Sequence, residues 1–117
     1  IAYMDLVMLS YFCKMGGIEE LVCTHMDIVY DRDIKVCVGY SKNGKNVSYR
    51  PDQEYINGIE PIYKNFKPWD KTMLKKCKSY NDVDESAKTF IKYISKETST
   101  QPVMITFGPD RNDSILL

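Results

Sequence analysis

Two side chains that follow a short apolar run, His25 and Asp27, have the types and spacing to bind a polar ligand. Residues 21–24 have the composition of a buried strand, and ligands of α/β proteins gather beyond the carboxyl ends of strands. An ionised Asp27 offers two acceptor oxygens for two parallel N–H groups of a planar edge such as that of guanine. If the strand continues, His25 and Asp27 share one face of it. The alternative is that Asp27 caps a turn and that His25 is an ordinary half-buried histidine.

A second predicted strand, residues 103–107, also ends in a polar loop, Gly108-Pro109-Asp110-Arg111. Both strands end as the parallel strands of βα units do, so the sequence predicts an α/β fold. Gly108 would let backbone amides approach a ligand closely, and Pro109 would present a flat apolar ring. Together the two loops predict a pocket for a planar base, and their spacing leaves the identity of the base open.

Composition narrows the class of protein. The 117 residues have 44% hydrophobic content, enough for one core, and 16 basic residues balance 16 acidic ones, so no overall field favours nucleic acid or a membrane. Four separated cysteines and one histidine do not predict a zinc site, and we expect free cysteines in a reducing cytosol. The chain begins with Ile1, so we expect it to be a fragment of a longer protein. It contains no apolar run of membrane-spanning length, so we expect no contact with a membrane.

Two helices are predicted from spacing and caps. Residues 5–15 carry apolar side chains at helical spacing, with Asp5 as N-cap and Gly16-Gly17 as the stop. Residues 82–97 should form the second helix, with Asp82 as N-cap and Glu85 as its capping-box partner. One face of this helix is apolar, formed by Ala87, Phe90, Ile91 and Ile94.

The middle of the chain should contain a hairpin and an irregular arm. Residues 34–40 alternate like a strand, and Asn43-Gly44 favours a tight turn into a returning strand at 47–49. We expect residues 51–58 to be a surface loop, residues 58–69 to be an irregular arm because of two prolines, and residues 115–117 to be a closing strand. Six lysines between Lys64 and Lys78 predict a solvated face, with an RNA-binding surface as the less favoured alternative.

The residues also resemble a known family, adenylosuccinate synthetase, in its C-terminal quarter. The matching pieces occur in the family's order and span nearly the whole chain. They are Met4-Asp5-Leu6, Thr24-His25-Met26-Asp27, Lys35-Val36-Cys37-Val38-Gly39-Tyr40, Gly58-Ile59-Glu60-Pro61-Ile62-Tyr63 with Trp69, and Gly108-Pro109-Asp110-Arg111.

This resemblance implies a cytoplasmic, homodimeric ligase of purine and AMP biosynthesis. Such an enzyme joins IMP and L-aspartate with GTP and Mg²⁺, giving adenylosuccinate, GDP and phosphate. It would phosphorylate the C6 oxygen of IMP, and the aspartate amine would then displace that phosphate. The fold implied is part of a nucleotide-binding sheet-and-helix domain related in site design to P-loop GTP-binding proteins, with residues 1–117 as one C-terminal segment.

The resemblance assigns guanine binding to His25, Asp27, Thr106, Gly108 and Pro109. His25 departs from the family, which has a lysine there, although an imidazole can also stack on a base. The phosphate loop, the catalytic aspartate and histidine, the magnesium ligands and the arginines for IMP and aspartate would belong to a preceding part. The segment alone should therefore be inactive and contain no catalytic residue or metal ligand. The alternative is a non-catalytic nucleotide-binding or scaffolding module that keeps the fold without the chemistry.

Overall fold

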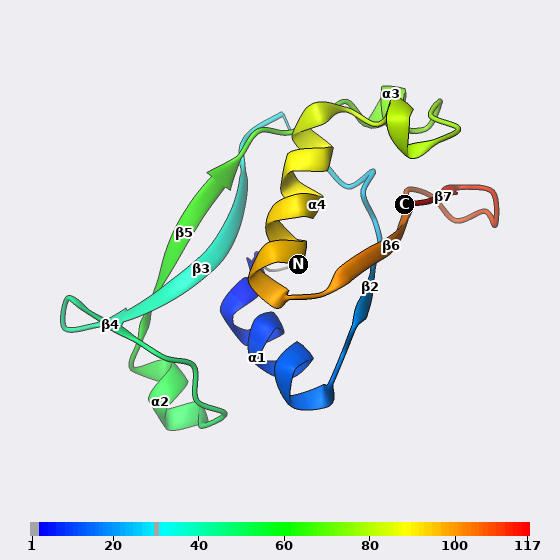
Figure 1. Cartoon of the computed structure of the whole chain (residues 1–117). Helices are drawn as coiled ribbons and strands as arrows, with labels where there is room; N and C mark the ends of the chain where they lie inside the picture. Colours follow the sequence, from blue (N-terminus) through cyan, green and yellow to red (C-terminus); the bar gives the residue numbers. More distant parts are fainter. Residues whose placement is uncertain (1–2, 30) are drawn as a thin grey trace.

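Two small β-sheets flank a pair of helices in the computed structural model, which describes residues 3–29 and 31–117 (Figure 1). In Figure 1 the helices α1 (Leu6–Gly16) and α4 (Glu85–Thr98) lie between β3 and β5 on the left and β2 and β6 on the right. The predicted mixed α/β class is confirmed.

The first sheet is built around one long strand, β3. Its strands are β1 (Met4–Asp5), β3 (Ile34–Lys42), β4 (Lys45–Val47) and β5 (Glu60–Phe66). Strand β1 pairs with β3 in parallel, while β4 and β5 pair with β3 antiparallel. The predicted turn is confirmed, because Asn43 and Gly44 have φ values of 50° and 73°, as a tight hairpin requires. The returning strand begins at Lys45, earlier than expected.

The expectation of an irregular arm at residues 58–69 was wrong for most of that segment. Glu60–Phe66 forms β5, which pairs with β3 from Ile34↔Phe66 to Ser41↔Glu60. Pro61 lies near the start of this strand, and among the described strands β5 has only β3 as a neighbour. A proline is tolerated on such an edge because its missing N–H is not needed on the open side.

The second sheet contains the two strands that carry the predicted site. Strand β2 (Glu20–Cys23) pairs in parallel with β6 (Gln101–Thr106), and β7 (Ser114–Leu116) pairs antiparallel with β6. The predicted parallel arrangement is confirmed, with each strand ending within about one residue of its expected bounds. The carboxyl ends of β2 and β6 therefore lie at the same edge of one sheet.

The first helix has the predicted caps. The Asp5 carboxylate accepts a hydrogen bond from Met8 N at 3.0 Å, and Gly17 ends the helix with φ of 63°. The second Asp5 oxygen accepts a hydrogen bond from the Tyr40 hydroxyl, which ties the start of α1 to strand β3.

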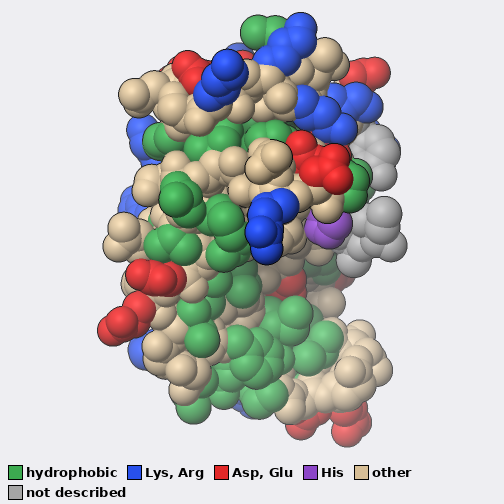
Figure 2. All heavy atoms as spheres, turned by 90° about the vertical axis from the view of Figure 1, so that its right-hand side faces the viewer, with side chains coloured by type: hydrophobic (Ala, Val, Ile, Leu, Met, Phe, Trp, Pro, Cys, Tyr) green, Lys and Arg blue, Asp and Glu red, His purple; other side chains and the backbone are tan. Residues whose placement is uncertain are grey.

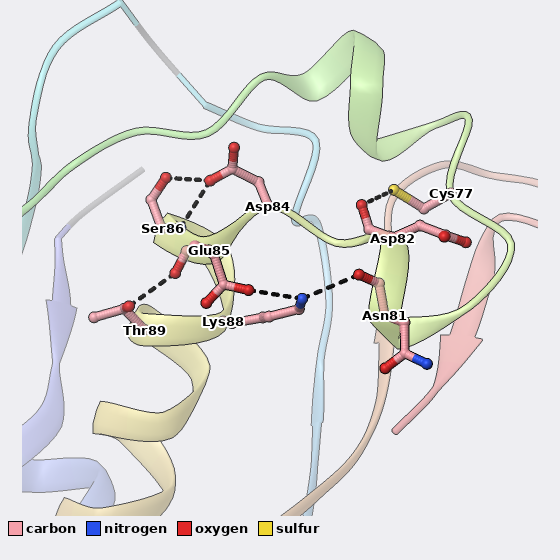
Figure 3. Close-up of polar contacts among 8 residues, drawn as sticks. All are labelled: Cys77, Asn81, Asp82, Asp84, Glu85, Ser86, Lys88 and Thr89. Atoms are coloured by element: carbon pink, nitrogen blue, oxygen red, sulfur yellow. Dashed lines mark hydrogen bonds and ion pairs between the residues drawn. The ribbon is translucent and has the colours of Figure 1, made fainter.

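The long helix α4 begins later than predicted. Its N-cap is Asp84, whose carboxylate accepts from Ser86 N at 2.7 Å, and Glu85 is the first helical residue (Figure 3). Asp82 instead belongs to the 3₁₀ turn η1 (Tyr80–Asp82) and accepts from Ser79 N at 3.0 Å. The predicted Asp82–Glu85 capping box was thus wrong, because Asp82 is used by the preceding turn.

Two short helices occur where none was predicted. Helix α2 (Gln53–Asn57) replaces part of the surface loop expected at 51–58, and Asp52 caps it by accepting from Tyr55 N at 2.9 Å. Helix α3 (Lys71–Leu74) follows Trp69, and Asp70 caps it by accepting from Thr72 N at 2.7 Å.

One core joins the helices to both sheets. The predicted apolar face of α4 is buried, and Val36 of β3 and Ile105 of β6 are fully buried. None of the four cysteines, all of which are described, forms a disulfide. The structure describes no helix with the length and hydrophobicity needed to span a membrane.

A broad apolar surface remains on one side of the described chain. Figure 2 shows hydrophobic side chains gathered over the lower part of the face that lies to the right in Figure 1. The exposed large apolar residues of α1 and the segment leading into and along β2 are Met8, Phe12, Met15, Ile18 and Val22. Exposed apolar patches of this kind commonly mark surfaces that other polypeptide covers.

Candidate functional site

The loop after β2 turns sharply. His25 has φ of 57°, a left-handed conformation that few residues other than glycine adopt, and Ile28 N donates to His25 O at 3.0 Å. The prediction that His25 and Asp27 share one face of a continuing strand was therefore wrong. His25 is exposed, whereas Asp27 lies in the turn with its side chain only 17% exposed.

Met26 attaches this loop to the rest of the chain. Its N–H donates to Thr106 O, the last residue of β6, at 2.9 Å. Its carbonyl accepts from Trp69 Nε1 at 2.6 Å, and its side chain is buried. Both backbone groups of Met26 are thus satisfied, and the loops that follow β2 and β6 are joined where they leave the sheet.

The Asp27 carboxylate contacts a lysine from a distant segment. Lys75 Nζ lies 3.7 Å from Asp27 Oδ2. A mostly buried carboxylate can accept N–H groups from a ligand.

The loop after β6 is closed by Asp113. Phe107 N donates to Asp113 O and Asp113 N to Asp110 O, both at 2.9 Å, while Asp110 N donates to Asp113 Oδ2 at 3.1 Å. A Cβ on Gly108 would lie 2.1 Å from Asp113 Oδ2. A side chain at position 108 would therefore force Asp113 to move, because the Asp113 side chain occupies the space that a Cβ would need. Pro109 is exposed beside it.

A cavity of about 980 Å³ lies next to this edge, between β2 and the first sheet. His25 and Met26 line it together with mostly apolar side chains that include Leu21, Ile34, Tyr63, Trp69 and Phe90. The other predicted site residues that the structure describes do not line it. The structure thus joins the loops of Asp27, Thr106, Gly108 and Pro109 through backbone contacts, while His25 faces a separate apolar space.

Nucleophilic and metal chemistry find little support in the described part of the chain. Burial raises the pKa of the Cys23 and Cys37 thiols, which line the cavity, so neither is an activated thiolate. Among residues 3–29 and 31–117, no group of three or more histidine, cysteine and acidic side chains is placed to hold a metal ion.

Comparison with known proteins decides the family. The adenylosuccinate synthetase family model matches residues 1–115. The chain belongs to the adenylosuccinate synthetase family. It is 34% identical to the adenylosuccinate synthetases of Malacoplasma penetrans, over 99% of the chain, and of Caldicellulosiruptor bescii, over 97%. The fully ligated adenylosuccinate synthetase of Plasmodium falciparum superposes with a TM-score of 0.90 at 26% identity, over 99% of the chain.

The match covers only part of each synthetase. The chain spans 28% of the Malacoplasma penetrans enzyme, 27% of the Caldicellulosiruptor bescii enzyme and 28% of the Plasmodium falciparum chain. The family is associated with ligase activity, purine biosynthesis and GTP binding.

Sequence reasoning missed the three residues that hold the two loops in place. The sequence predicts Trp69 as part of the arm, the family motif and the aromatic–lysine run, predicts Lys75 as part of a solvated face, and gives no signal for Asp113. All six lysines of the run are exposed, as predicted, yet Lys64 lies 4.1 Å from the centre of the Tyr93 ring and Lys75 contacts Asp27. The clustering of lysines in the sequence does not predict which of them contact Tyr93 and Asp27.

Proposed function

We propose that this chain is the C-terminal part of a GTP-dependent ligase that joins IMP and L-aspartate to form adenylosuccinate, GDP and phosphate. Family membership over nearly the whole chain supports this assignment. The exposed apolar residues of α1 support it as well, since the remaining part of a longer enzyme would cover them. The full-length protein would then be a cytoplasmic homodimer that uses Mg²⁺.

Within that enzyme, this segment supplies the guanine-binding side of the site. The observation that carries this role is the hydrogen bond from Met26 N to Thr106 O, which joins the loop of Asp27 to the loop of Gly108 and Pro109. Guanine presents N1–H and its exocyclic amine as two parallel donors, and a carboxylate is the side chain that accepts both. Asp27 accepts these donors, and the loop after β6 contacts the base.

The catalytic steps belong to other parts of the enzyme. The phosphate loop, the residues that phosphorylate IMP, the magnesium ligands and the arginines for IMP and aspartate lie outside residues 1–117. The role of this segment is to select and orient GTP, and the isolated segment is inactive.

The test is Asp27→Asn in the full-length enzyme. The substitution places an amide donor or a weaker acceptor opposite the guanine amine, and such a mismatch costs about 2–4 kcal/mol, or roughly 30- to 1000-fold in affinity. Xanthine has a carbonyl where guanine has the amine, so the variant should weaken for GTP and gain for XTP. Affinities for IMP and aspartate should stay nearly unchanged. Calorimetric titration with each ligand measures all four.

Asp110→Asn is the matched control, because it makes the same change in the neighbouring loop on an exposed side chain. It should leave the preference for GTP over XTP unchanged. Equal weakening of Asp27→Asn toward GTP and XTP would remove Asp27 from the base site. A full-length protein that binds GTP but forms no adenylosuccinate would favour the non-catalytic binding module instead.

A further inference from the structure

The segment from Trp69 to Lys75 contacts the Asp27 loop at two adjacent positions. The Trp69 indole donates to Met26 O at 2.6 Å, and Lys75 Nζ lies 3.7 Å from Asp27 Oδ2. Both contacts come from one short stretch that includes α3. This stretch therefore determines the position of the Met26 backbone and the electrostatic surroundings of the next side chain.

The backbone of Lys75 is held firmly although its side chain is half exposed. Lys75 follows α3, and its N–H donates to Lys71 O at 3.3 Å. The preceding residue, Leu74, is buried in the core, and Asp70 caps the start of α3. The Lys75 side chain consequently projects from an anchored turn, with 54% of its surface in solvent.

The geometry leaves room for a ligand on the same carboxylate. A separation of 3.7 Å is longer than the range of about 2.7–3.2 Å for an N–H···O hydrogen bond, so Lys75 acts on Asp27 as a nearby charge. It approaches Oδ2, and a carboxylate has about four lone-pair positions on its two oxygens. Four positions are enough for two parallel N–H groups beside the contact with Lys75.

We propose that Lys75 is a positioning residue for guanine recognition by Asp27, a role that rests on the function proposed above. When a base covers Asp27, the carboxylate loses its remaining contact with water. A buried carboxylate is costly unless a positive charge compensates it. Lys75 supplies that charge from the solvent side and does not contact the base.

The experiment is a double-mutant cycle in the full-length enzyme, with Lys75→Met, Asp27→Asn and the combined variant. Lys75→Met should weaken GTP binding roughly three- to fivefold, in line with a partly exposed ion pair. In the Asp27→Asn background the same change should have no effect, because no charge remains to compensate. Lys75→Arg should retain affinity close to that of the unchanged enzyme.

Two controls separate the charge effect from a structural one. Lys76→Met removes the adjacent exposed lysine and should leave GTP affinity unchanged. IMP affinity should be the same in all variants, since a disturbed fold would lower it together with GTP affinity. The effect of Lys75→Met should shrink at about 1 M salt, where the Debye length falls to about 3 Å.

The outcomes distinguish this proposal from the function on which it rests. In one outcome, Asp27→Asn changes the preference from GTP to XTP while Lys75→Met either leaves GTP affinity unchanged or lowers it equally with Asp27 and with Asn at position 27. That result would overturn the role of Lys75 and leave the guanine site standing. If Asp27→Asn leaves base preference unchanged, the guanine site itself fails. Coupling between Lys75 and Asp27 that disappears at high salt supports the proposal.

Discussion

Gly108→Ala should damage both the loop after β6 and GTP binding. The new Cβ would lie 2.1 Å from Asp113 Oδ2, 2.7 Å from its Cγ and 3.0 Å from its Cβ. Rotation of the Asp113 side chain can move the first two atoms away, but it also removes the acceptor of Asp110 N. The contact with Asp113 Cβ at 3.0 Å persists under any rotation of the side chain, so the loop must give by a few tenths of an ångström.

The expected loss follows from these two consequences. A hydrogen bond to a charged acceptor contributes about 1.5–3 kcal/mol, and overpacking by one carbon costs about 1–3 kcal/mol. Because the loop is largely exposed and can relax locally, we expect the free energy of unfolding to fall by about 1–3 kcal/mol in total. If this loop contacts the base, GTP affinity should fall by a similar free energy, roughly 5- to 150-fold. Urea denaturation and calorimetric GTP titration of the full-length enzyme measure the two effects.

Gly58→Ala is the matched control, since its Cβ would lie 3.6 Å from its nearest neighbours, an ordinary contact distance. It should change neither quantity. In an Asp113→Ala background, Gly108→Ala should cost clearly less than it does alone, because the closest contacts are gone. Unchanged stability and GTP affinity for Gly108→Ala would refute the packing argument, whereas lost stability with intact GTP affinity would place this loop outside the base site.

Three further substitutions test other parts of the structure. His25→Lys, which restores the family's usual residue, should keep or improve GTP affinity in the full-length enzyme, and a loss of more than about tenfold would assign the histidine a separate role. Trp69→Phe leaves the Met26 carbonyl without its donor and should lower the free energy of unfolding by about 1–3 kcal/mol, as measured by urea denaturation. Asp84→Ala should lower it by about 1 kcal/mol at neutral pH. The hydrogen bond from the Ser86 side chain lowers the pKa of Asp84 below 3.8, so this contribution is present above that value and should disappear as the pH falls through the lower folded-state pKa. A difference that persists in strong acid would contradict the capping role.

The sequence by itself determined the features that depend on neighbouring residues. Asp5 caps α1, Gly17 ends it, and Asn43-Gly44 forms the hairpin, as predicted. The buried face of α4 also follows from the spacing of its apolar residues. Each of these needs only the conformational preferences and hydrogen bonds of a few consecutive residues.

Tertiary structure decided the elements whose local signals were ambiguous. Residues 60–66 carry a proline and aromatic residues that suit an arm as well as a strand, and pairing with β3 makes them β5. Asp82 and Asp84 are both good caps, and the 3₁₀ turn that uses Asp82 leaves Asp84 for α4. In both cases the outcome depends on contacts that local propensity does not contain.

The candidate site divides in the same way. Asp27 could be selected from the sequence because a carboxylate just beyond the end of a strand is a common ligand-binding group. Its partners could not, since Thr106, Trp69 and Lys75 are distant in sequence and lie next to this loop only in the folded arrangement of both sheets and α3. A lysine in a basic run looks like its neighbours in sequence, and only the fold shows that Lys75, which follows the buried Leu74, lies next to Asp27. Long-range contacts depend on the path of the whole chain, so only the tertiary structure determines them.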